Sequence, residues 1–180
     1  MSRPPIFLAC LLLLGCLAGG PFYTVSDARP AIAPGDYRLT GQVPQGGPEI
    51  LRVSRLPDGR TRFVPPDRPE EPLDAGFTPL DDEGRFFIAW STPRPSAETG
   101  TQSYALAARE SRGAWRFYLG FCEGLDDIAR SVGARVVPEG RTTACLFPER
   151  AGFERFMRRA IARRARMRPR SALLTPVAAP

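Results

Sequence analysis

The sequence predicts a mainly β fold, an antiparallel meander that forms a curved sheet or a small barrel and carries one or two C-terminal α-helices. Three observations support this prediction. Apolar side chains alternate with polar or small ones along several short stretches of the chain. Twenty prolines and seventeen glycines interrupt the chain often, which disfavours long helices. The 180 residues, 43% of them hydrophobic, are enough for one domain with its own core.

The first predicted strands follow residue 36. Alternation begins at residues 37–41, and residues 50–56 and 60–64 are two further candidates joined by the turn sequence Pro57-Asp58-Gly59. The proline-rich stretch 65–69 must interrupt the sheet, because proline has no N–H to donate to a neighbouring strand. Together these stretches predict a meander of short strands.

The clearest strands come next, at residues 86–91, 104–108 and 115–121. Several carry aromatic residues on both faces. A sheet that faces water on one side has polar residues on that side. We therefore expect helices or loops to cover part of the outside of the sheet.

Two helices and one more strand are predicted after this sheet. Residues 123–132 have apolar side chains at helical spacing, and Gly133 suits the C-terminal cap. Residues 142–147 form a further strand. The longest helical pattern covers residues 148–168, and its apolar stripe consists of Phe153, Phe156, Met157, Ala160 and Ile161.

The N-terminus has the features of an export signal. Arg3 is followed by the uncharged apolar run 6–14 and then by small residues. A membrane-spanning helix needs about 20 apolar residues, so this run is too short to be one.

The sequence Leu13-Leu14-Gly15-Cys16 resembles the lipobox of bacterial lipoproteins. The resemblance implies that the Cys16 thiol receives a diacylglycerol, that the chain is cut before this residue, and that its new amino group is acylated. Leu17 at the next position favours the outer membrane over the inner one by the sorting pattern of the family. The protein would then face the periplasm of a bacterial envelope. Two alternatives remain: secretion after cleavage behind Ala18, and an uncleaved anchor.

These features predict four parts of the chain. Residues 1–15 are the signal peptide, residues 16–35 a Gly/Pro/Ala-rich tether, residues 36–168 the β-rich domain with its basic helix at 148–168, and residues 169–180 a disordered tail.

Cys122 and Cys145 are predicted to form a disulfide, because an even pair of cysteines in an exported chain most often does. The bond would close a loop of about 24 residues and contribute roughly 3–4 kcal/mol. A zinc site is not expected from two thiolates without histidine.

The chain contains neither histidine nor lysine, and all 25 basic residues are arginine. This excludes an imidazole base, a histidine metal ligand and a Schiff-base lysine. The carboxylates of Glu123, Asp126 and Asp127 are explained by the positive end of a helix dipole, and those of residues 81–83 by a solvated turn. We expect no enzymatic activity, no metal and no cofactor.

Residues 150–170 hold nine arginines and one acidic residue, Glu154. Such a basic helix can bind anionic lipid or an envelope polymer, or it can simply be a solvated face. Nucleic acid is not expected as a partner of an exported chain. The residues predicted for anionic contact are Arg155, Arg158, Arg159, Arg163 and Arg166.

Gly35-Asp36-Tyr37, at the first predicted strand, resembles the Gly-x-Trp opening of lipocalin-like barrels. This resemblance implies a barrel that carries a small hydrophobic ligand. The function we expect first is instead that of a lipid-anchored envelope protein that acts by binding or as a structural part, with the lipocalin-like carrier as the alternative.

Overall fold

The computed structural model describes residues 17–41, 49–91, 102–118, 122, 124–139, 142–164 and 171–177. The predicted signal peptide and Cys16 lie outside these residues. The strands are β1 (Leu17–Gly19), β2 (Gly35–Gly41), β3 (Glu49–Arg55), β4 (Thr61–Val64), β5 (Leu73–Pro79), β6 (Phe86–Ser91), β7 (Gln102–Arg109), β8 (Trp115–Tyr118), β9 (Arg135–Glu139), β10 (Thr142–Phe147) and β11 (Ser171–Pro176). The helices are α2 (Asp126–Ser131) and α3 (Arg150–Arg164), with short 3-10 turns η1 (Val25–Asp27) and η3 (Ser111–Gly113).

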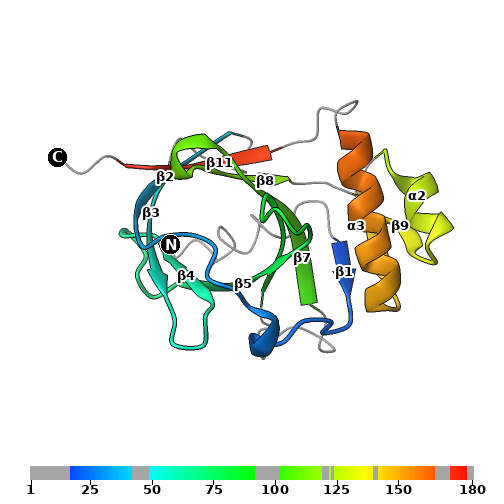
Figure 1. Ribbon diagram of the computed structural model, residues 1–180, viewed down its shortest axis with the longest axis horizontal. Coiled ribbons are helices and arrows are strands. Elements are labelled where there is room, and N and C mark those ends of the chain that lie inside the picture. The colour runs from blue at the N-terminus through cyan, green and yellow to red at the C-terminus, as the bar shows by residue number, and fades with distance from the viewer. Residues whose placement is uncertain are drawn as a thin grey trace, which may run out of the picture.

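Eight of the strands form a closed antiparallel barrel (Figure 1). Strands β2 to β8 follow one another around it, β11 fills the place between β8 and β2, and the β6–β7 pair completes the ring. The predicted antiparallel meander, closed into a small barrel, is thereby confirmed. The alternating pattern was a reliable guide because each strand has one face towards the barrel interior.

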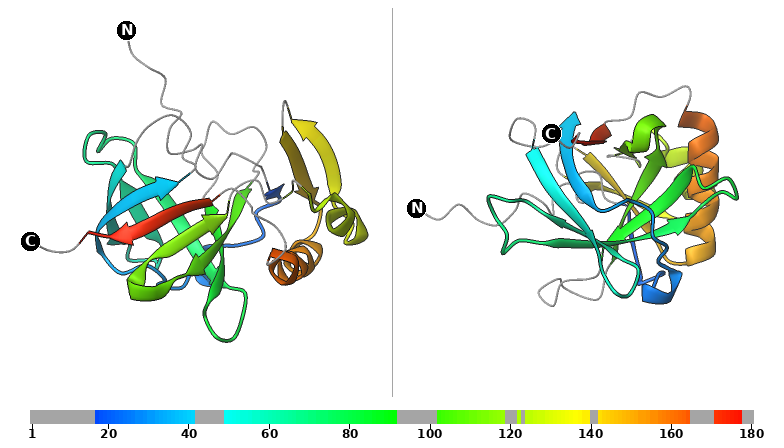
Figure 2. Two further views of the ribbon diagram at one scale, coloured as in Figure 1. Left: turned by 90° about the horizontal axis from the view of Figure 1, so that it is seen from above. Right: turned by 60° about the vertical axis from the view of Figure 1, so that its left-hand side comes forward.

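The three remaining strands form a side sheet, which we define as β1, β10 and β9. It extends from β7, since β1 pairs with β7 antiparallel on one side and with β10 parallel on the other. Helix α3 packs against this sheet beside the barrel (Figure 2). The expectation that helices cover part of the sheet is confirmed.

The molecule has two hydrophobic cores, one on each face of β6 and β7. Small residues of β7, Ala105 and Ala107, face the barrel interior, where they leave room for Phe87 and Trp115. The second core, which we call the outer core, lies outside the barrel and under α3. Its larger members include Leu17, Tyr23, Ile88, Trp90, Tyr104, Leu106, Phe147, Phe153, Phe156 and Met157.

The predicted tether at residues 16–35 is wrong, because residues 17–35 pack against the domain. Leu17, Tyr23 and Ile32 are at most 2% exposed. The stretch has no sequence period because regular structure is confined to short elements, and its buried residues belong to different cores: Tyr23 to the core outside the barrel and Ile32 to the barrel interior. Its apolar side chains are buried by tertiary contacts that leave no repeating pattern.

The predicted tail at residues 169–180 is also wrong, since Ser171–Pro176 is the barrel strand β11. Pro176 is the last residue of this strand, where proline is tolerated. Helix α3 begins at Arg150 rather than at residue 148, and residues 165–168 of the predicted helix lie outside the described residues. Helix α2 is Asp126–Ser131, which is shorter than the predicted 123–132. Gly133 adopts a φ of 88° after α2, as a C-terminal cap requires.

Candidate functional site

The segment that follows Cys16 is held to the domain along its length. We call residues 17–29 the N-terminal strap. In β1, Leu17 lies opposite Tyr104 of β7 and Cys145 of β10. The strap then passes η1, and its last residue, Arg29, donates its backbone N–H to Phe77 O over 2.8 Å. The strap therefore bridges the barrel and the side sheet.

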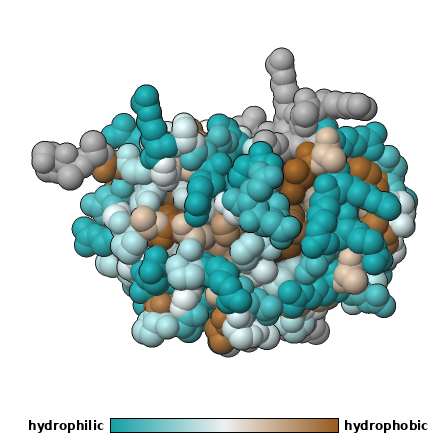
Figure 3. Space-filling view, in the orientation of Figure 1, coloured by the Kyte–Doolittle hydropathy of each residue, from teal (hydrophilic) through white to brown (hydrophobic). Residues whose placement is uncertain are grey.

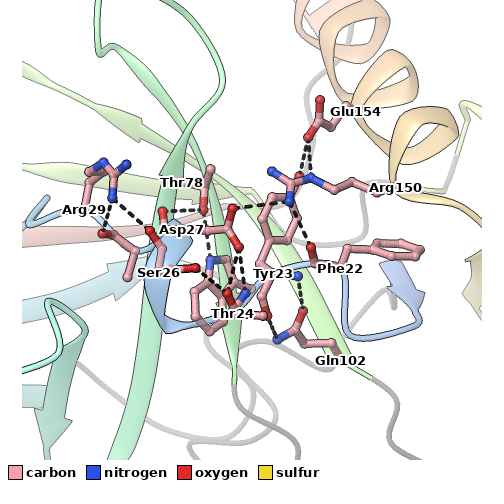
Figure 4. Close-up of polar contacts among 12 residues, drawn as sticks. Phe22, Tyr23, Thr24, Ser26, Asp27, Arg29, Thr78, Gln102, Arg150 and Glu154 are labelled. Atoms are coloured by element: carbon pink, nitrogen blue, oxygen red, sulfur yellow. Dashed lines mark hydrogen bonds and ion pairs between the residues drawn. The ribbon is translucent and has the colours of Figure 1, made fainter.

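Gln102 fastens the middle of the strap through its amide group (Figure 4). Its Oε1 accepts the backbone N–H of Tyr23 at 3.2 Å, and its Nε2 donates to the backbone oxygen of Tyr23 at 2.9 Å. The Tyr104 hydroxyl accepts the backbone N–H of Phe22 at 3.0 Å and lies 2.7 Å from Gln102 Oε1. Burial raises the pKa of Tyr104. A buried glutamine is stabilising here because its polar atoms have partners.

Arg150, the first residue of α3, fastens the strap to the helix. Its guanidinium donates to the backbone oxygen of Phe22 at 3.1 Å and to Asp27 Oδ1 at 3.2 Å. It also donates to Glu154 Oε1 at 2.9 Å and lies 4.3 Å from the centre of the Tyr23 ring. One cation thus satisfies a backbone carbonyl and two carboxylates, and stacks on an aromatic face.

Tyr23 completes this junction between strap and helix. Its hydroxyl donates to Glu154 Oε1 at 3.1 Å, while its ring packs edge-on against Phe153 at 6.4 Å between centroids. Burial of the phenol, together with the nearby negative charge of Glu154, raises its pKa. Tyr23 therefore stays neutral and continues to donate this hydrogen bond throughout the physiological range.

Replacing Asp27 with asparagine should lower the melting temperature at neutral pH but not in strong acid. The hydrogen bond from the Thr24 backbone, together with Arg150, lowers the pKa of Asp27. A lowered folded-state pKa contributes stability above the ordinary aspartate value of roughly 3.9, and this stability is lost as the pH falls through the folded-state value. Thermal unfolding of Asp27→Asn and wild type across this range measures the difference. The uncharged control Ser26→Ala should differ from wild type by the same amount at every pH; such a constant difference for Asp27→Asn would contradict the prediction.

The predicted disulfide is confirmed. The sulfur atoms of Cys122 and Cys145 are 2.04 Å apart, and both residues are fully buried. The bond joins β10 of the side sheet to the chain just before α2. It therefore lies in the outer core, beneath α3.

The acidic residues predicted near α2 have a structural explanation. Asp127 Oδ2 accepts a hydrogen bond from Arg163 of α3 at 2.6 Å, and this bond lowers the pKa of Asp127. Asp126 lies in the first turn of α2, and Glu123 is outside the described residues. In the turn before β6, Asp81 Oδ1 accepts the backbone N–H groups of residues 85 and 86. No group of three potential metal ligands occurs among the described residues.

The predicted arginines are spread over the outward side of α3. Arg159 donates to Ser131 Oγ at 3.1 Å and Arg163 pairs with Asp127, so both connect α3 to α2. Arg158 lies 3.6 Å from Glu154, and Arg155 is exposed. Arg166 is outside the described residues. Among the helices that are described, none is long and apolar enough to cross a membrane.

Three residues that hold the N-terminal strap in place were not predicted as site residues. They are Tyr23, Gln102 and Arg150. Arg150 belongs to the basic run, which conceals its separate role. Gln102 lies at the edge of a polar loop sequence, and its contact with Tyr23 spans 79 residues of chain. The only available signal was an aromatic pair, Phe22-Tyr23, inside a stretch otherwise typical of a linker. In comparisons with family models, curated proteins and solved structures, no match to this chain was found.

Proposed function

We propose that the protein is a bacterial envelope lipoprotein, anchored through lipid on Cys16 and facing the periplasm, that acts without catalysis as a binding or structural component. The observation that carries this proposal is the burial of Leu17, which directly follows the lipobox cysteine and pairs with β7 and β10. Cleavage before Cys16 keeps every described residue of β1. Cleavage after Ala18 would remove two of its three residues, and Leu17 is only 1% exposed.

The free energy that the fold would lose without Leu17 favours cleavage before Cys16. Full burial of a leucine side chain is worth about 1.5–3 kcal/mol, and loss of one from a core costs about 2–5 kcal/mol. A domain is stable by only about 5–15 kcal/mol in total. A mature chain that begins after Ala18 would therefore give up a large part of its stability.

The disulfide supports the same compartment. Structural disulfides persist in oxidising compartments such as the periplasm and are rare in reducing ones. The Cys122–Cys145 bond is buried, so it acts as a structural link. The absence of histidine and lysine from the sequence supports a role without catalysis, because the commonest general base and the usual amine nucleophile are both missing.

The barrel fold is compatible with a lipocalin-like carrier, but the interior side chains favour a structural role. Phe77 lies 6.0 Å from Trp115 and 6.5 Å from Phe63 between ring centroids, and Phe87 lies 5.2 Å from Trp115. These rings meet across the barrel. A ligand site of about 300 Å³ or more would have to displace them. Trp90 is not part of this interior cluster, because its side chain belongs to the core outside the barrel.

Membrane attachment should depend on Cys16 and not on Cys10. We would express the full chain in a bacterium as wild type, Cys16→Ser and Cys10→Ser, fractionate the cells and measure intact masses. Wild type and Cys10→Ser should appear in the membrane fraction with a mass that starts at Cys16 and includes acyl chains. Cys16→Ser should lack acyl chains, since only the cysteine thiol accepts the diacylglycerol. Cys10 is the matched control because it is a second cysteine of the N-terminal segment, six residues before Cys16 and outside the lipobox-like sequence.

A soluble, unacylated wild-type chain that begins after Ala18 would overturn this proposal. An acylated mass for Cys16→Ser would overturn the proposal as well.

A further inference from the structure

We infer that the arginine-rich outward face of α3 rests on the anionic phospholipid head groups of the membrane that holds the anchor. This inference rests on the proposed lipid at Cys16. Its basis is a juxtaposition: the basic half of α3 lies at the end of the molecule where β1 begins.

The chain direction establishes this juxtaposition. Strand β10 runs parallel to β1 and ends at Phe147, and α3 starts three residues later and runs back along the side sheet. Arg150, at the start of α3, contacts Phe22, which lies beyond the end of β1. The C-terminal half of α3 therefore lies towards the end of the side sheet from which β1 runs, as Figure 1 also shows.

All charged residues in the C-terminal half of α3 are positive. Residues 155–164 contain five arginines and no acidic residue. Hydrophilic side chains cover the outward side of α3 in Figure 3. A helix dipole favours cations only in the last turn of a helix, so it does not account for Arg155 and Arg158, which lie further back in α3.

Most hydrogen-bond donors of Arg155, Arg158, Arg159 and Arg163 have no partner within the described part of the chain. A guanidinium carries five N–H groups. Arg159 and Arg163 each direct a nitrogen to α2, while Arg158 approaches Glu154 only at 3.6 Å, and no partner of Arg155 is found among the described residues. Phosphate oxygens of lipid head groups are suitable acceptors for the remaining N–H groups.

The short distance between anchor and fold makes this attraction effective. Charges act on a membrane within a Debye length of about 8 Å at physiological salt. Residues 17–35 pack against the domain instead of forming a tether, so lipid on Cys16 would keep the domain at the surface. Each arginine near an anionic surface contributes about 1 kcal/mol.

The test uses the chain that begins at Leu17, which retains every described residue and lacks the anchor. Its binding is measured by co-sedimentation with vesicles of phosphatidylcholine alone and of phosphatidylcholine mixed with phosphatidylglycerol. Binding to the anionic vesicles alone, weakened by salt, is expected. This test needs no lipid on Cys16. Vesicle binding can therefore fail while the mass experiment supports the anchor, and vesicle binding can succeed while the mass experiment shows no anchor.

A pair of double variants tests the position of the surface. Arg155→Gln with Arg158→Gln should lower the partition coefficient on anionic vesicles about 30-fold, from two arginines at about 1 kcal/mol each. The matched control, Arg38→Gln with Arg55→Gln, removes the same charge from exposed positions of β2 and β3, on the side of the barrel away from α3 (Figure 1). This control should bind nearly as wild type does, and melting temperatures confirm that both variants fold.

Three results would overturn the inference. One is equal binding of the wild-type chain to both kinds of vesicle, or to neither. Another is an equal loss in both double variants, which would reflect net charge alone. The last is binding to a soluble anionic polymer but not to anionic vesicles, which would indicate an envelope polymer as the partner.

Discussion

Replacing Phe153 with alanine is expected to lower the free energy of unfolding by about 3–5 kcal/mol. The Phe153 ring is fully buried at the centre of the outer core. It lies 4.6 Å from the Tyr104 ring and 5.2 Å from the Phe147 ring between centroids, and it also contacts Phe22 and Tyr23 of the strap. Its removal leaves a cavity where the barrel, the side sheet, the strap and α3 meet.

Urea unfolding followed by tryptophan fluorescence measures this loss. Trp90 belongs to the same core as Phe153, and Trp115 belongs to the barrel interior, so the two regions can be compared. The matched control is Val25→Ala, an apolar truncation in the strap at a residue that is 50% exposed, and it should change stability by at most about 0.5 kcal/mol. A loss in Phe153→Ala as small as in this control would contradict the central position that we assign to the ring.

Loss of the Cys122–Cys145 disulfide is expected to cost about 3–4 kcal/mol, from the restored freedom of the loop in the unfolded chain. The two cysteines are 23 residues apart in the sequence, and the loop between them contains α2 and β9. We would compare wild type with the double variant Cys122→Ala and Cys145→Ala by urea unfolding. Alanine fills the buried positions without leaving a free thiol.

Reductant separates the effect of the bond from that of the substitutions. Added to the wild-type chain, it should reproduce most of the loss, and added to the double variant it should change nothing. If reduced and oxidised wild type were equally stable, the bond would not be a structural link. The periplasmic location would then lose one of its supports.

The barrel could largely be predicted from the sequence because its strands obey a local rule. Residues 86–91 and 104–108 alternate strictly between two environments, the barrel interior and the outer core. That alternation identifies a strand whatever its neighbours are. The cap at Gly133 follows from an equally local cause, because glycine adopts a positive φ at little cost.

Strands β1 and β11 could not be predicted in the same way. Strand β1 has three residues, too few for a period, and exists because β7 and β10 offer it hydrogen-bonding edges on both sides. Strand β11 follows the arginine-rich segment and ends in a proline, features typical of a loose tail. It pairs with β8 on one side and β2 on the other and so closes the barrel. No local sequence pattern predicts this position.

Some features of the candidate site also follow from local sequence, whereas others depend on contacts between distant residues. The pairing of Cys122 with Cys145 and the basic character of residues 150–170 could be predicted from the sequence, because each depends on residue types and their spacing. The lipobox proposed at Cys16 rests on the same kind of local signal and stays a prediction. The roles of Arg150 and Gln102 depend on partners 128 and 79 residues away, so only the folded chain could reveal them.

By itself, the sequence determined the β class, the predicted export and lipid-attachment motif, the disulfide pair and the concentration of positive charge. Each of these depends on alternation, composition or a short motif, which are local properties. Only the tertiary structure decided that the segment after Cys16 is a packed strap and that the basic half of α3 lies beside its origin. The reason is that burial of Leu17 and Tyr23, and the direction of α3, come from contacts between distant segments.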